Sequence, residues 1–190
     1  MIAGQPVAPL AIEQLLSARF RLLGPQGLTG IAMAAIDMAL RLDDEALAWI
    51  EEPTLADDYD GHARIARAVR TPIQCGENWW GPHDTRKAIA AGASDYMMLD
   101  VMKIGGVTGW LRAAALAEVH GIRLSNHLFV EVSAHLMCAT PTAHWLEYAE
   151  WFNPIIERPL RVADGCALLD ERPGSGVEWN EQAVARYQVE

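Results

Sequence analysis

Five short apolar runs, each ending in a polar or charged side chain, constrain the fold of this chain more than any other feature. They lie at residues 46–53, 71–80, 95–106, 121–129 and 142–148. Between them, apolar residues recur at helical spacing over residues 61–69, 84–92, 107–121 and 131–140. Strands that alternate with helices of about ten residues predict βαβ units and a parallel sheet. The fold class is therefore α/β.

The segments on either side of this alternation have a different character. Residues 1–42 show helical spacing that is interrupted at Gly24-Pro25, and they contain no strand pattern. From about residue 153 the pattern favours short strands, with turns at 163–165 and 173–176, and then a last helical turn. We divide the chain into residues 1–42, 43–152 and 153–190, and expect the third part to fold back onto the first.

Composition limits the partners of the protein. The net charge of -10 and the lack of a Lys/Arg-rich run argue against a nucleic-acid or anionic-membrane partner. No apolar stretch approaches the ~20 residues of a membrane span, and the N-terminus lacks the features of a signal peptide. The three cysteines form no CxxC pair, which argues against a disulfide framework or a thiolate zinc site. We expect buried thiols and a cytoplasmic location.

The side chains that end the five runs are the candidates for chemistry. Consecutive βα units place the carboxyl ends of their strands on one rim, which is where α/β enzymes have their active sites. A single acid there needs no explanation, but charged groups at the ends of five apolar strands are costly unless they are paired or bind a metal. These residues are Glu51, Glu77, Asp100, His127 and Glu147.

The residue types on this rim suggest two kinds of site. Glu51 and Glu77, on adjacent strands, suit a hard cation such as Mg²⁺. Asp100 and His127, on the next two strands, suggest an acid that orients an imidazole acting as a general base. From spacing alone, Asp100 is equally a candidate third metal ligand.

Two further residues have weaker assignments. Glu147 would close the rim as a proton donor to a developing oxyanion. Lys103 is a second possible base, and a structural lysine is an equal alternative. We expect most of the strand and helix tryptophans to lie in the core rather than in a substrate pocket; they are Trp49, Trp79, Trp80, Trp110 and Trp145.

The strand-end motifs, in their order and spacing, resemble the mandelate racemase branch of the enolase superfamily. The motifs are WIEEPT, GENWWGP, LDVMKIGGVTGW, SNHLF and TPTAHWLE, and they run from about Trp49 to Glu147. The resemblance implies a TIM-type (β/α) barrel with an α+β capping domain, an essential Mg²⁺, and removal of a proton next to a carboxylate. The first forty residues resemble the end of the capping region, and the PGSGVEW tail resembles its C-terminal return.

The resemblance also implies a role for each rim residue. Glu51 and Glu77 match two of three carboxylates that hold Mg²⁺. His127 matches the general base on one face of the substrate, and Asp100 matches its dyad partner rather than a metal ligand. Glu147 matches the acid that hydrogen-bonds the substrate carboxylate as it becomes an enediolate.

The sequence departs from the family pattern before the first run. The family has three more barrel strands there, which carry a Lys-x-Lys base and the first metal-ligand aspartate. No Lys-x-Lys occurs in these 190 residues, and Asp43 and Asp44 lie in a helix-like stretch, so we assign neither as the ligand. Lys103 matches a lysine that is catalytic in other branches, and a supporting role is implied here. We expect about five of eight barrel strands, weakened Mg²⁺ affinity, and proton exchange on one face only.

The leading expectation is a Mg²⁺-dependent racemase or isomerase, or a related acid-sugar dehydratase, acting on a small carboxylate such as a 2-hydroxy acid. Homo-oligomerisation would cover the open edges of a partial barrel. The alternatives are a non-catalytic remnant, and a metal- or small-molecule-binding module without turnover. A rate assay separates the first from the other two.

Overall fold

The computed structural model of the chain describes residues 14–16, 33, 37, 43, 45–169 and 171–189. It divides into two compact units, Met1–Gly76 with His83–Met97, and Glu77–Pro82 with Met98–Glu190. Gln14–Leu16, Met33 and Asp37 are helical. The rest of the expected N-terminal helical segment lies outside the described residues, and so does Asp44.

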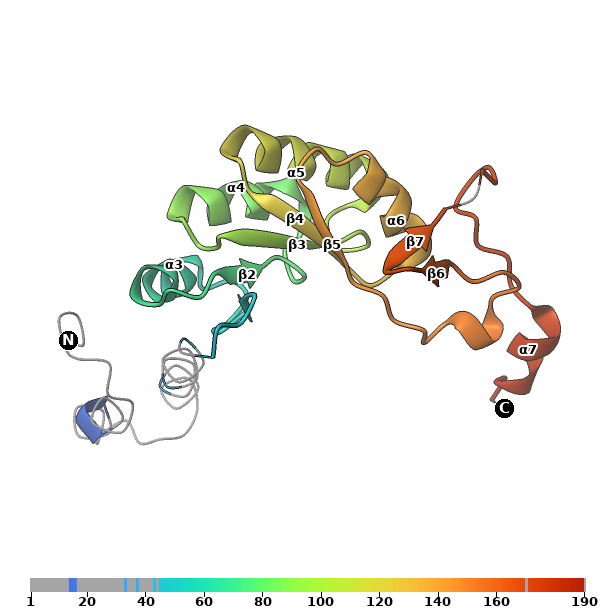
Figure 1. The fold of residues 1–190 in the computed structure, drawn as a ribbon, viewed down its shortest axis with the longest axis horizontal. Coiled ribbons are helices and arrows are strands. Elements are labelled where there is room, and N and C mark those ends of the chain that lie inside the picture. The colour runs from blue at the N-terminus through green and yellow to red at the C-terminus, as the bar shows by residue number, and fades with distance from the viewer. Residues whose placement is uncertain are drawn as a thin grey trace. The chain divides into compact units, whose positions relative to one another are not determined.

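The five expected strands form one parallel sheet in the order of the sequence (Figure 1). They are β1 (Ile50–Glu51), β2 (Ile73–Cys75), β3 (Tyr96–Asp100), β4 (Arg123–His127) and β5 (Ala143–Leu146). The helices between them are α3 (Tyr59–Ala68), α4 (Gly81–Ala91), α5 (Gly106–His120) and α6 (Val130–Cys138). In a (β/α) barrel, each strand is followed by a helix and the parallel strands lie in sequence order. The strands and helices described here follow this pattern. The α/β fold class and the five strands are confirmed.

Acidic side chains organise the first unit. Asp58 caps α3, accepting a hydrogen bond from the Gly61 amide at 2.9 Å. Asp43 accepts hydrogen bonds from the amides of Arg70 and Thr71 at 2.7 and 2.6 Å, and these residues lead into β2. Partial burial alone would raise the pKa of Asp43, but the hydrogen bonds from Thr71 and Arg70 hold this pKa below its ordinary value. Asp43 is therefore a structural anchor of the loop before β2.

The core of the second unit is built on helix α5. Trp110 is fully buried and donates a hydrogen bond from Nε1 to Thr140 Oγ1 at 3.0 Å. Ala113 and Ala117, on the same face, are also fully buried. One position on α5 admits only glycine, because a Cβ at Gly109 would lie 1.9 Å from the carbonyl oxygen of Ile104. This close approach fixes the loop between β3 and α5 against the helix.

The tail begins with a 3₁₀ turn, η1 (Asn153–Ile155), and continues into a hairpin. The hairpin pairs β6 (Arg161–Ala163) with β7 (Cys166–Leu168) in antiparallel register, and helix α7 (Glu181–Arg186) follows. The expected turns at 163–165 and 173–176 are present. The expected return onto residues 1–42 involves residues outside the described ones, and the three-part division of the chain stays a prediction.

Two expectations about side-chain burial are wrong in part. Cys75 is buried, and burial raises the pKa of its thiol, but Cys138 and Cys166 are exposed. Trp79 and Trp110 are buried, but Trp80 is 70% exposed and Trp145 is 58% exposed.

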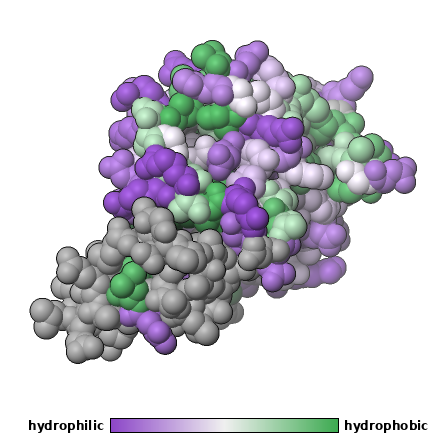
Figure 2. Space-filling view, turned by 60° about the vertical axis from the view of Figure 1, so that its left-hand side comes forward, coloured by the Kyte–Doolittle hydropathy of each residue, from purple (hydrophilic) through white to green (hydrophobic). Residues whose placement is uncertain are grey.

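On the face that Figure 2 presents, hydrophilic and hydrophobic residues are intermixed. No helix among the described residues is long and apolar enough to cross a membrane.

Candidate active site

The carboxyl ends of β3 and β4 bring Asp100 and His127 into direct contact. Asp100 Oδ2 lies 2.8 Å from His127 Nδ1. The other carboxylate oxygen, Oδ1, accepts hydrogen bonds from the amides of Met102 and Lys103 at 2.7 and 3.1 Å. Asp100 is 3% exposed, so these bonds satisfy a buried charge. A carboxylate with both oxygens occupied in this way orients the imidazole, and the geometry favours this role over that of a metal ligand.

The second nitrogen of His127 faces another rim acid. His127 Nε2 lies 3.5 Å from Glu77 Oε2, and Glu77 Oε1 accepts a hydrogen bond from Asn78 Nδ2 at 3.0 Å. Asn78 Oδ1 in turn accepts from Lys103 Nζ at 2.8 Å. Because the Lys103 amide also bonds Asp100, these contacts close a ring of polar groups. Lys103 takes part in it by holding Asn78 and Asp100, which fits the supporting role that the resemblance implies.

Glu147 follows β5 and is held by the turn after His127. Its Oε2 accepts a hydrogen bond from the Leu128 amide at 2.7 Å. Its backbone amide donates to Asn126 Oδ1 at 2.8 Å, and its carbonyl accepts from Asn126 Nδ2 at 3.2 Å. The register between β4 and β5 is irregular at this point. The buried side chain of Asn126 bridges the two strands there and fixes the position of the Glu147 backbone.

The turn between β4 and α6 has an unusual backbone. Leu128 and Phe129 have φ angles of 47° and 45°, in the left-handed region that costs an L-residue about 1–2 kcal/mol. The Leu128 carbonyl accepts hydrogen bonds from Asn126 Nδ2 at 3.0 Å and from Ser133 Oγ at 3.1 Å. Strain of this kind is found where a functional group must be presented in one position. Here it directs the Leu128 amide at Glu147.

Glu51 ends β1 in the first unit. Its Oε2 lies within hydrogen-bonding distance of two donors, Trp49 Nε1 at 3.2 Å and Gln74 Nε2 at 3.3 Å. Among the described residues, no group of three or more His, Cys, Asp or Glu side chains is arranged to hold a metal ion. The second unit therefore brings together Glu77, Asp100, Lys103, His127 and Glu147, and the pairing of Glu51 with Glu77 around an ion stays a prediction.

Sequence reasoning missed three residues of this site: Asn78, Asn126 and Ser133. Asn126 had a signal, since a polar side chain inside an apolar strand requires hydrogen-bond partners. Asn78 stands beside an expected metal ligand, but nothing in its spacing distinguishes it from a loop residue. Ser133 lies in the first turns of α6, and only the backbone conformation before that helix shows what its hydroxyl reaches.

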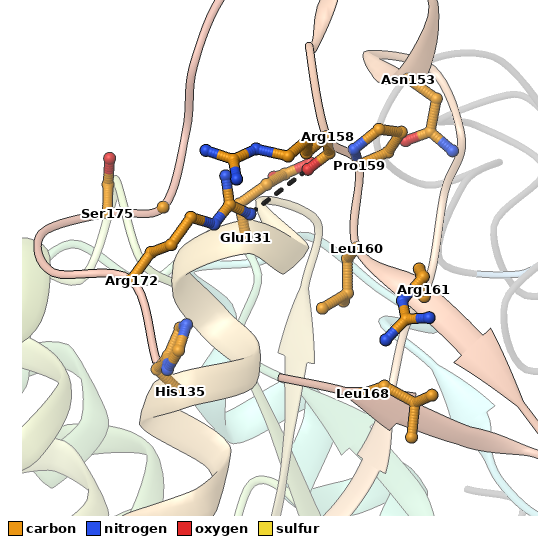
Figure 3. Close-up of a pocket in the computed structure, with 11 residues that line it drawn as sticks. Glu131, His135, Asn153, Arg158, Pro159, Leu160, Arg161, Leu168, Arg172 and Ser175 are labelled. Carbon is orange, nitrogen blue, oxygen red and sulfur yellow. Dashed lines mark hydrogen bonds between the residues drawn. The ribbon is translucent and has the colours of Figure 1, made fainter. Parts of the chain in front are cut away.

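A separate cavity of about 390 Å³ lies beside the tail. Figure 3 shows Glu131 and His135 of α6 on one side of it, and Arg161 with Leu168 on another. Arg158, also in its wall, forms an ion pair with Glu178 at 2.7 Å. The cavity contains none of the rim residues, so it is distinct from the candidate active site.

Comparison with known proteins identifies the family of this chain. Residues 29–183 match the family described as enolase C-terminal domain-like. The L-talarate/galactarate dehydratase of Salmonella typhimurium is 35% identical over 173 residues, covering 91% of this chain and 44% of that protein. The 3,6-anhydro-alpha-L-galactonate cycloisomerase of Streptomyces coelicolor is 32% identical, covering 94% and 50%.

The fold comparison agrees with the sequence comparison. A solved enolase from Bradyrhizobium, complexed with magnesium and mandelic acid, superposes with a TM-score of 0.75 at 32% identity, covering 99% of this chain and 80% of that one. The chain spans about half the length of the two curated relatives. The matched residues include all five strands and the whole rim, and the chain belongs to the enolase C-terminal domain-like family of the enolase superfamily.

Proposed function

We propose that this chain carries one face of a Mg²⁺-dependent site that removes the proton next to the carboxylate of a small acid. The observation that carries the proposal is the contact of buried Asp100 with His127, together with Glu147 held at the neighbouring strand end. The substrate class is an acid sugar or another 2-hydroxy acid. The names of the relatives support this class, since one is a dehydratase of talarate and galactarate.

His127 is the proposed general base. Since Asp100 is buried and accepts hydrogen bonds at both oxygens, the ring nitrogen facing it, Nδ1, must be the one that carries the proton. Nε2 then has its lone pair available to accept the α-proton of the substrate. The positive charge that the ring gains is stabilised by the adjacent carboxylate of Asp100.

Glu147 is the proposed acid. One of its oxygens, Oε2, is fixed by the Leu128 amide. In its protonated form, Glu147 would donate a hydrogen bond from Oε1 to the substrate carboxylate. That bond strengthens as negative charge develops on the carboxylate oxygens, and a preorganised donor of this kind lowers the barrier.

Glu51 and Glu77 are the proposed metal ligands. Their oxygens are the donors that Mg²⁺ prefers, and within the described residues neither carboxylate is neutralised by an ion pair with Lys or Arg. A bound Mg²⁺ would supply positive charge opposite the substrate carboxylate. The Bradyrhizobium enolase, crystallised with magnesium and mandelic acid, supports this combination of ion and ligand.

Dehydration is the proposed overall reaction rather than racemisation. Racemisation requires a base on each face of the carbon, whereas elimination of water can start from a base on one face. His127 is the proposed base on the described part of the rim, and a relative of this chain is named as a dehydratase of talarate and galactarate. We therefore propose that His127 exchanges the α-proton of one enantiomer, with loss of a β-hydroxyl where the substrate has one.

The test is proton exchange followed by ¹H NMR in D₂O, with saturating Mg²⁺ and with galactarate or either enantiomer of mandelate. We expect Mg²⁺-dependent loss of the α-proton signal, from only one mandelate enantiomer. His127→Asn should abolish it, and the matched change His120→Gln, at an exposed histidine of α5, should not.

Three results would contradict parts of this proposal. No exchange by the wild-type chain would reject the enzymatic function. Calorimetric binding of Mg²⁺ and galactarate without exchange would then favour a binding module. Rapid interconversion of the mandelate enantiomers would reject the one-sided mechanism.

A further inference from the structure

We infer that Asn126 and Ser133 are positioning residues for Glu147, acting through the backbone of Leu128. The inference rests on the proposed function in one respect, the role of Glu147 as the acid. Neither residue faces the substrate in this scheme. Together they hold the left-handed turn whose amide fixes one oxygen of the Glu147 carboxylate.

Asn126 connects the turn to both strands of the site. Its side chain is fully buried, and its Nδ2 donates to the carbonyls of Leu128 and Glu147 at 3.0 and 3.2 Å. Its Oδ1 accepts from the Glu147 amide at 2.8 Å. One side chain therefore fixes the backbone of Glu147 and the peptide that binds the Glu147 carboxylate.

Ser133 makes a more selective contact. It is fully buried in α6, and its Oγ donates to the Leu128 carbonyl at 3.1 Å. Leu128 and Phe129 both have positive φ angles without being glycine, so the turn is held by its hydrogen bonds rather than by local preference. Loss of a bond to the Leu128 carbonyl should let the turn relax and move the Leu128 amide away from Glu147.

A purely structural role would give a different result from a positioning role. If a residue has only a structural role, its substitution lowers the free energy of unfolding, and the molecules that remain folded keep the wild-type kcat and KM. A positioning residue lowers kcat, because the acid no longer meets the developing charge, and it changes KM less. A small misplacement of a catalytic group can cost about 10²-fold in rate.

The experiment compares Ser133→Ala with Ser125→Ala in the full chain. Ser125 is a matched control, because its buried Oγ also joins β4 to β5, accepting from the Trp145 amide at 3.3 Å, without contacting Leu128. Asn126→Asp is the second variant, since it keeps the acceptor for the Glu147 amide and removes both donated bonds. The first readout is ¹⁵N NMR of the Leu128 amide, and the second is kcat and KM for α-proton exchange.

In Ser133→Ala we expect the Leu128 amide to exchange with solvent about tenfold faster and its proton resonance to move upfield, because the short bond to a carboxylate is weakened. We expect kcat to fall by about tenfold or more, with a smaller change in KM. Ser125→Ala should leave the Leu128 amide and kcat at their wild-type values.

Two outcomes overturn the inference. The first is a Leu128 amide with wild-type exchange and chemical shift in both Ser133→Ala and Asn126→Asp. The second is a perturbed amide with wild-type kcat. If the wild-type chain itself shows no proton exchange, the proposed function has failed, and the amide measurements alone decide whether Asn126 and Ser133 hold the turn at Glu147.

Discussion

The substitution Asp100→Asn tests how Asp100 orients His127, apart from its contribution to the stability of the fold. The substitution keeps the side-chain volume and keeps Oδ1, which accepts from the Met102 and Lys103 amides. It replaces Oδ2, the acceptor 2.8 Å from His127 Nδ1, with an amide group that donates. His127 must then present a lone pair at Nδ1 and carry its proton on Nε2. That nitrogen is the one proposed to accept the substrate proton.

The expected effects on stability and on rate differ in size. A hydrogen bond to a charged group contributes about 1.5–3 kcal/mol, and the neutral bond that replaces it contributes about 0.5–1.5 kcal/mol. The free energy of unfolding should therefore fall by about 1 kcal/mol. General-base catalysis contributes about 10²- to 10⁴-fold, and the same amide change at a catalytic triad lowers kcat by about 10⁴-fold through the wrong tautomer. We expect a rate loss of about 10³-fold.

Three measurements check this prediction: α-proton exchange in D₂O, urea unfolding, and ¹⁵N NMR of the His127 ring, which reports the protonated nitrogen. Asp95→Asn is the control, because Asp95 precedes the same strand and accepts a bond from the Ile73 amide at 2.8 Å, away from the rim. An Asp100→Asn variant that keeps its ring proton on Nδ1, or that exchanges substrate within tenfold of the wild type, would refute the reasoning.

Three further predictions concern stability and are measured by urea unfolding. Asp43→Ala should lower the free energy of unfolding by about 2 kcal/mol at pH 7. Since hydrogen bonds from Thr71 and Arg70 outweigh burial and lower the pKa of Asp43, this difference should shrink as the pH falls below about 4. Burial lowers the pKa of His62, so the unfolded chain binds more protons below about pH 6.5 and stability falls there; His62→Gln should flatten that slope. Gly109→Ala should cost about 3 kcal/mol, because its Cβ would lie 1.9 Å from a backbone oxygen, and an unchanged unfolding midpoint would refute that clash.

The strand ends could be predicted from the sequence because the pattern repeats. Each apolar run followed by a helical segment adds one βα unit, and parallel strands bring their carboxyl ends to the same edge. Asp100 and His127 are the last residues of their strands, and Glu147 follows the last residue of β5. Their pairing needed the resemblance as well, since spacing alone left Asp100 open as a metal ligand.

The parts that could not be predicted depend on backbone conformation. Positive φ angles at Leu128 and Phe129 have no signal in the sequence, since neither is glycine or asparagine. The bond from the Leu128 amide to Glu147 exists only because of that conformation. From the sequence, Lys103 could be either a catalytic base or a structural lysine. Its contact with Asn78 depends on how two loops converge, which the sequence pattern does not show.

The hydrogen bonds at both oxygens of Asp100 also have an entropic consequence. A histidine on a surface loop samples several ring orientations, and ordering it during a reaction adds to the activation barrier. Here two backbone amides fix one oxygen of Asp100, and the other oxygen fixes the ring of His127. The ordering of the imidazole is complete once the strands and their loops have folded. Substrate binding should therefore cost little further rotational entropy of the His127 ring.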